Sequence, residues 1–73
     1  MSEEFLIKLG QNISERAKAK FKTNLEFASA CEIDEASIRR ILKGKQNFSI
    51  KIFLKICTAL DVKMSELLLE LNL

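Results

Sequence analysis

The chain of 73 residues lacks histidine, proline, tryptophan and tyrosine, and it contains only two glycines and two cysteines. Without histidine, neither the usual zinc site nor a nucleophile built from cysteine and histidine can be assembled. We also find no recognisable pairing of an acid with a nucleophile. The sequence therefore predicts a protein that is not an enzyme and has no metal and no cofactor, and it gives no sign of a small-molecule substrate.

Long apolar runs and a basic leader are also missing. No stretch approaches the roughly 20 apolar residues that a membrane span needs, and the N-terminus begins with Ser2, Glu3 and Glu4 instead of a basic region. The two cysteines, Cys31 and Cys57, lie among apolar residues and are expected to be buried thiols in a reducing compartment. We expect a soluble, cytoplasmic protein without a membrane partner.

Residues that favour β-strands are scarce. Val62 is the single valine, and the isoleucines and phenylalanines recur at helical intervals. The length allows one small domain, residues 1–73. The periodicity predicts five helices, over about residues 3–20, 24–32, 35–43, 50–61 and 64–71. The expected fold is all-α, a compact five-helix bundle with short connections.

The residue types at the expected helix ends support these bounds. Thr23 and Glu26 fit a capping box, in which the threonine hydroxyl accepts from the third amide and the glutamate accepts from the cap amide. Asp34 and Ser49 stand where N-caps are expected, and Gly44 stands where a left-handed residue would end a helix. Asp34 is therefore predicted to be structural, with its carboxylate at the positive end of a helix dipole.

The distribution of charge is more informative than the net charge of +2. No acid lies between residues 36 and 60, and six basic residues lie there: Arg39, Arg40, Lys43, Lys45, Lys51 and Lys55. A basic cluster of this kind suits a polyanion such as DNA, although a solvated helix face has the same appearance in the sequence.

Two short helices joined by a tight turn, residues 24–31 and 35–43, have the form of a helix-turn-helix. Such a unit needs a small residue where the two helices come closest and branched apolar residues facing it. Ala28, Ile38 and Ile41 meet this requirement. The segment resembles the helix-turn-helix family of phage repressors and Cro-type regulators, the XRE-like family.

The resemblance extends beyond the helix-turn-helix, over about residues 5–70. Ile33 stands where the family closes the turn with an apolar residue. "LGQNISERAKAK" is similar to the first helix of the family, "LKGKQNFSIKIFLKICTALDV" to its glycine stop and fourth helix, and "KMSELL" to the start of its fifth. The resemblance implies a lambda-repressor-like DNA-binding domain, with double-stranded DNA as the partner.

The family also implies a role for individual positions, with the third helix in the major groove. By position, the residues expected to face base edges are Glu35, Ala36, Arg39 and Arg40, and those expected to contact the DNA backbone are Asn24, Ser37, Lys43, Lys45, Asn47 and Lys51. Arginine suits guanine, glutamate suits cytosine and alanine suits the thymine methyl group. For the basic residues the alternative is a solvated charge, and for Ser37 it is a local helix-surface hydroxyl.

Two departures from the family pattern affect the expected structure. Glu32 stands where the turn usually has glycine, so either Glu32 is left-handed or the turn differs. Many members pair an arginine late in the first helix with a glutamate near the end of the recognition helix, and here Ala17 and Leu42 occupy those positions. Replacing both ions with apolar residues is compatible with the fold.

The sequence favours a sequence-specific transcriptional regulator that acts as a homodimer, because one module of this size buries little DNA surface. The expected dimer contacts are Val62, Leu69, Leu71 and Leu73, whereas Leu67 and Leu68 also fit the core of the domain itself. The alternative is a protein-interaction module of a toxin-antitoxin or phage regulatory pair, with Glu32, Asp34 and Glu35 as its contact surface. Glu35 can read a cytosine, support the first helical turn or weaken DNA binding.

Overall fold

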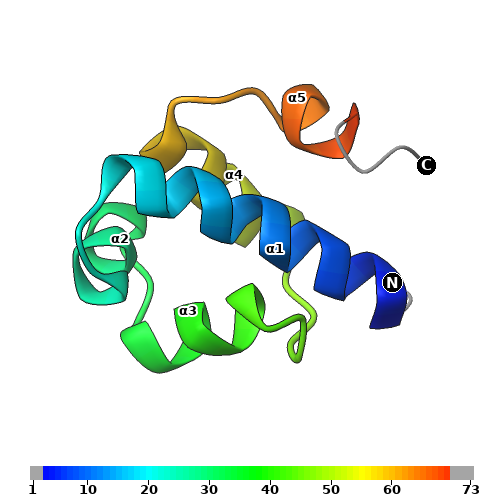
Figure 1. The fold of residues 1–73 in the computed structure, drawn as a ribbon, viewed down its shortest axis with the longest axis horizontal. Helices are drawn as coiled ribbons and strands as arrows, with labels where there is room; N and C mark the ends of the chain where they lie inside the picture. Colours follow the sequence, from blue (N-terminus) through cyan, green and yellow to red (C-terminus); the bar gives the residue numbers. More distant parts are fainter. Residues whose placement is uncertain (1–2, 70–73) are drawn as a thin grey trace.

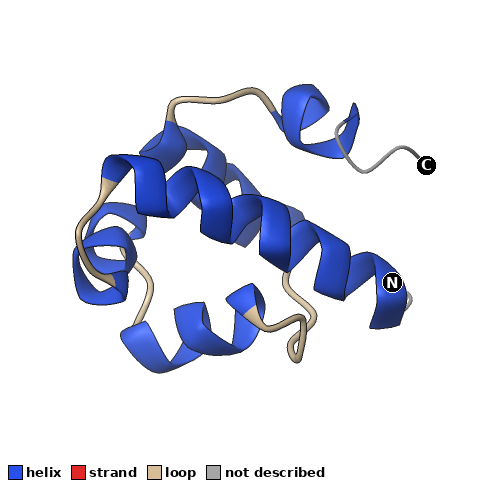
Figure 2. Cartoon of the chain, in the orientation of Figure 1, coloured by secondary structure: helices blue, strands red, loops and turns tan. Residues whose placement is uncertain are grey.

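The structure is a computed structural model that describes residues 3–69 of the chain. Over these residues the chain forms five helices and no strand: α1 (Glu3–Lys20), α2 (Asn24–Cys31), α3 (Glu35–Leu42), α4 (Ile50–Leu60) and α5 (Met64–Leu69) (Figure 2). The predicted all-α fold is confirmed, and the predicted ends of α2, α3 and α4 are within one residue of the observed ones. Residues 70 and 71, which the sequence places in the last helix, lie outside the described part.

The long helix α1 runs through the middle of the molecule, with α3 on one side and α5 on the other (Figure 1). α2 packs against α3 and α4, and α4 packs against α1 and α5. Asn12 of α1 donates a hydrogen bond to the carbonyl of Leu67 in α5 over 3.1 Å. The helix-turn-helix formed by α2 and α3 is therefore held on a scaffold made of α1 and α4.

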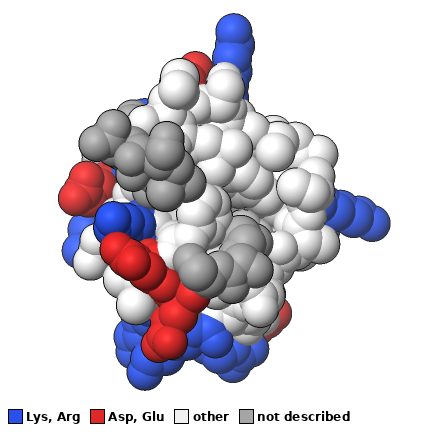
Figure 3. All heavy atoms as spheres, turned by 90° about the vertical axis from the view of Figure 1, so that its right-hand side faces the viewer, with Lys and Arg blue, Asp and Glu red and all other residues white. Residues whose placement is uncertain are grey.

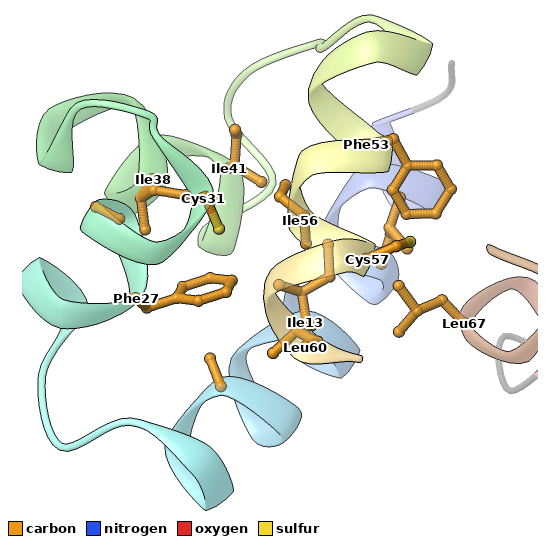
Figure 4. Close-up of a cluster of buried hydrophobic side chains, with 13 residues drawn as sticks. Ile13, Phe27, Cys31, Ile38, Ile41, Phe53, Ile56, Cys57, Leu60 and Leu67 are labelled. Carbon is orange, nitrogen blue, oxygen red and sulfur yellow. The ribbon is translucent and has the colours of Figure 1, made fainter. Parts of the chain in front are cut away.

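One apolar cluster with side chains from all five helices fills the interior (Figure 4). Its buried members are Leu9, Ile13, Ala17, Phe27, Ala28, Cys31, Ile38, Ile41, Phe53, Ile56, Cys57, Leu60 and Leu67. Leu67 is fully buried, so its position in the core of the domain is confirmed. Both thiols are free, and burial raises the pKa of Cys31 to about 11 and also raises the pKa of Cys57, which keeps them protonated.

The N-terminal ends of three helices carry the predicted caps. The side chains of Thr23, Asp34 and Ser49 each accept a hydrogen bond from the amide three residues later, over 3.1, 2.9 and 3.2 Å. The capping box differs in one bond, because Glu26 accepts from the amide of Lys22 over 3.2 Å and not from the cap residue. The glutamate thus bridges the connection between α1 and α2, which Phe21 also anchors by packing on Phe27 with 5.5 Å between ring centroids.

Within residues 3–69, α2, α3 and α4 each end on a left-handed residue, at Glu32 (φ 58°), Gly44 (φ 72°) and Asp61 (φ 56°). After α3, the amide of Gly44 bonds to the carbonyl of Ile41 over 3.0 Å and the amide of Lys45 bonds to that of Arg40 over 2.9 Å. The other two helix ends repeat this pair of bonds, which defines a Schellman motif. Of the two possibilities that the sequence left open, the structure shows the first: Glu32 adopts the left-handed conformation.

Replacing Glu32 with glycine should stabilise the protein. We expect Glu32→Gly to raise the free energy of unfolding by about 1 kcal/mol, because glycine has no Cβ to strain the left-handed conformation. Urea unfolding followed by circular dichroism measures the change. Glu32→Gln is the matched control, since it removes the charge near the negative end of α2 and keeps the Cβ. An equal gain from Glu32→Gln would attribute the effect to charge and contradict the backbone explanation.

Both glycines of the chain lie where α1 meets the end of α3. A Cβ on Gly10 would lie 2.6 Å from the carbonyl oxygen of Ile41 and 2.7 Å from that of Leu42. A Cβ on Gly44 would lie 2.5 Å from the Cα of Ile7. No side chain larger than a hydrogen fits at either position. The two glycines therefore allow the close approach of α1 to the end of α3.

Candidate nucleic-acid interface

The helix that would read DNA, α3, begins at the cap formed by Asp34. The Asp34 carboxylate accepts from the amide of Ser37 over 2.9 Å, and this hydrogen bond to the charged form holds the pKa of Asp34 below its ordinary value. The carboxylate also lies at the positive end of the helix dipole. The predicted structural role of Asp34, the first of two successive acids at the start of α3, is confirmed, because its carboxylate is bonded to an amide of that helix.

The second acid, Glu35, is paired with a basic residue of the same helix. Its Oε1 lies 2.9 Å from Nη2 of Arg39, one turn further along α3. The Glu35 side chain is 32% exposed and that of Arg39 is 58% exposed, so solvent screens the pair. Glu35 therefore offsets the positive charge of Arg39 within the helix. To contact a base, the two side chains must either break this ion pair or meet the base as a pair.

Arg40 has a different environment, although it is the next residue in the chain. Its Nε donates a hydrogen bond to Oε1 of Gln46 over 2.7 Å, and its Nη2 lies 3.4 Å from the hydroxyl of Ser37. Both hydrogen-bond partners are neutral, so they orient the guanidinium without forming an ion pair with it. After the hydrogen bond from Ser37, the charge of Arg40 also contributes to lowering the pKa of Asp34. Arg40 is exposed on α3 together with Ala36, which precedes it by one helical turn.

The remaining predicted DNA contacts lie around α3 in the chain. Asn24 begins α2, Lys43 and Lys45 flank Gly44, Asn47 lies in the connection to α4, and Lys51 lies in the first turn of α4; all five side chains are exposed. Within residues 3–69, no carboxylate forms an ion pair with any of the three lysines. Basic side chains also gather along the lower edge of the molecule, where α3 lies in Figure 1 (Figure 3).

Gln46 is the residue that sequence reasoning missed. It is half-buried in the connection between α3 and α4, and its bond to Arg40 spans six residues. The spacing of a helix predicts contacts three or four residues apart, so it does not reach a residue beyond the glycine stop. By contrast, Glu35 and Arg39 are four residues apart, which is the spacing at which oppositely charged side chains pair on a helix. This ion pair could therefore have been predicted from the sequence.

The side of the molecule that carries α5 and the start of α1 has a broad uncharged surface (Figure 3). Leu69 in α5 is 77% exposed, and Ile50 and Leu54 in α4 are also exposed. Val62 is half-buried and lines a hollow of about 710 Å³ together with Leu54. Of the predicted dimer contacts, Leu69 is exposed and Val62 is half-buried, whereas Leu71 and Leu73 lie outside the described residues.

Among residues 3–69, no group of three or more histidine, cysteine, aspartate or glutamate side chains is placed to hold a metal ion. None of the helices described is both long enough and apolar enough to span a membrane.

The comparisons with known proteins agree with this geometry. Residues 12–69 match the family model of the Cro/C1-type HTH DNA-binding domain, and the chain belongs to this family. It is a DNA-binding transcriptional regulator of the XRE-like helix-turn-helix type. Among solved structures, the restriction-modification controller protein C.AhdI from Aeromonas hydrophila is similar, with 31% identity, a TM-score of 0.83, and 88% of this chain and 97% of that chain covered. The comparison with curated proteins gives no significant match.

Proposed function

We propose that residues 1–73 act as one helix-turn-helix unit, which binds a specific operator as a homodimer with α3 in the major groove. The observation that carries the proposal is the environment of Arg40, an exposed arginine on α3 whose guanidinium is oriented by neutral hydrogen-bond partners and has no ion pair within residues 3–69. An arginine held in this way suits guanine O6 and N7, the commonest specific contact in the major groove.

The other base contacts follow from their places on α3. Ala36 is exposed one turn before Arg40 and suits a thymine methyl group. Glu35 and Arg39 are proposed to meet base edges as well, either as the ion pair that they form or after that pair opens. Opening the ion pair costs free energy, whereas Arg40 has no ion pair within residues 3–69 to break before it contacts a base. Arg40 is therefore expected to contribute most to sequence preference.

The proposed backbone contacts surround these residues. Asn24 begins α2, where the helix amides suit a phosphate, and the exposed side chains of Lys43, Lys45 and Lys51 supply positive charge. Ser37 and Asn47 supply further hydrogen-bonding groups for the phosphates. These contacts position α3 and do not distinguish sequences.

Dimerisation is proposed through α5 and the connection that precedes it. The exposed Leu69 and the half-buried Val62 offer apolar side chains to a second copy. The hollow beside Leu54 has a mixed lining, which also includes Asp61, Lys63 and Glu66. Leu71 and Leu73 are proposed to extend this contact. Two copies would present two α3 helices to successive major grooves, which a single module of this size needs for tight operator binding.

The name of the similar structure supports a regulatory setting. C.AhdI is a restriction-modification controller protein, and from this similarity we infer a controlling role for this chain, which it would exert by binding an operator. The protein-interaction alternative has less support, because Asp34 and Glu35 of the acidic turn already have partners within α3.

Selection of duplexes from a random pool, followed by measurement of the mass of the complex, tests the proposal. We expect enriched sites with two-fold symmetry, two protein chains on each duplex, and a steep loss of affinity with salt. Three lysine contacts to phosphates in each protomer predict a slope of log K against log salt of about −5. Failure to bind any duplex at low salt would contradict the proposal, and loss of a protein partner on charge reversal at Glu32 or Glu35 would favour the alternative.

A further inference from the structure

We propose that Gln46, outside the recognition helix, is a positioning residue for DNA reading: it holds the guanidinium of Arg40 in the orientation that meets a guanine. The inference rests on the proposed function, in which Arg40 reads a base. Gln46 has no direct DNA contact in the proposed function, and the spacing of residues along a helix does not predict its bond to Arg40. Gln46 would therefore affect sequence preference through Arg40 alone.

The hydrogen bonds fix which edge of the guanidinium remains available. A guanidinium carries five N–H groups in one plane, one on Nε and two on each Nη. The Nε–H is taken by Oε1 of Gln46 at 2.7 Å, and Nη2 faces the hydroxyl of Ser37 at 3.4 Å. The two outward N–H groups at the Nη1 and Nη2 end remain available, and they form the parallel pair that guanine O6 and N7 accept.

The backbone around Gln46 is fixed before DNA binds. Gly44 holds the start of this connection against the backbone of Ile7, and Lys45 bonds back to the carbonyl of Arg40. On the other side, Phe48 packs on Phe53 with 6.0 Å between ring centroids. Gln46 is half-buried between these two anchors, which hold its backbone near Arg40, while the bond between the two side chains lies at the exposed surface. The anchored backbone reduces the freedom that Gln46 loses when DNA binds.

The chemistry of an amide matters at this position. In the pair between Glu35 and Arg39, a carboxylate orients an arginine and also offsets its charge. Gln46 accepts the same kind of hydrogen bond without adding negative charge, so Arg40 keeps its attraction to DNA. This contrast separates the effect of orientation from the effect of charge and determines which variants test the proposal.

Gln46→Met tests orientation in the full-length protein, because methionine has a similar volume and lacks the amide acceptor. We expect about 10-fold weaker binding to the selected operator, unchanged binding to a non-specific duplex and an unchanged salt slope. Gln46→Glu keeps an acceptor and adds a charge, so it should weaken binding to every duplex and make the salt slope shallower. Thermal unfolding of both variants establishes that the fold is retained.

A double-mutant cycle with Arg40→Ala shows whether Gln46 acts through Arg40. In the Arg40→Ala protein, Gln46→Met should have no further effect on operator binding. An equal loss with and without Arg40 would overturn the proposal, as would full operator affinity of Gln46→Met.

If the unmodified protein binds no duplex, the proposed function fails. If Arg40→Ala relaxes the sequence preference and Gln46→Met has no effect, only the positioning role fails.

Discussion

Gly44→Ala is expected to lower the free energy of unfolding by about 3 kcal/mol or more, which is a large share of the stability of a small domain. Gly44 has a φ of 72°, and its new Cβ would lie 2.5 Å from the Cα of Ile7 and 2.7 Å from its backbone nitrogen. The neighbouring atoms belong to the backbone of α1, so no rotamer change relieves the contact. Either α1 or the end of α3 must move.

Urea unfolding followed by circular dichroism measures the loss, and Asp61→Ala is the matched control. Asp61 is also left-handed, with a φ of 56°, and it is exposed at the end of α4. We expect Asp61→Ala to cost about 1 kcal/mol or less, because it keeps a Cβ in the same conformation without the contact to α1. Equal losses in the two variants would show that the close approach of α1 contributes nothing.

The helices of this fold were predictable because their signals are local. Thr23, Asp34 and Ser49 each cap a helix through a bond to an amide three residues away, so residue type and spacing are sufficient evidence. The end of α3 was predicted one residue too late, since Lys43 keeps nearly helical dihedrals (φ −89°, ψ −2°) although α3 ends at Leu42. The helix end is defined by the bonds around Gly44, which the sequence locates only approximately.

The features that the sequence did not reveal depend on contacts between elements. Gly10 lies inside α1, where glycine is unfavourable for the helix. The structure explains it, because a Cβ at this position would lie 2.6 Å from the carbonyl oxygen of Ile41 at the end of α3. The bond between Gln46 and Arg40 likewise depends on where the chain turns after Gly44. The sequence left three roles open for Glu35, and the structure adds its ion pair with Arg39.

Arg40→Ala and Lys45→Ala are expected to weaken DNA binding in different ways. Loss of Arg40 should cost about 1 to 3 kcal/mol at one base pair of each half-site and flatten the preference for guanine there. Loss of Lys45 should weaken binding to all sequences alike and reduce the salt slope by about 1 for each protomer, because a phosphate contact releases counterions. Titration of the selected operator and of duplexes altered at single base pairs, at several salt concentrations, separates the two effects.

The contrast between the two variants is the test, because both remove one positive charge from the same region of the surface. Lys45 follows the glycine stop and has no ion pair with a carboxylate within residues 3–69, whereas Arg40 lies on α3 with two neutral hydrogen-bond partners. If charge alone determined binding, the two variants would behave alike. A uniform loss across all duplexes in both would therefore assign Arg40 to the DNA backbone, and base reading on α3 would then rest on Ala36 and on the pair of Glu35 and Arg39.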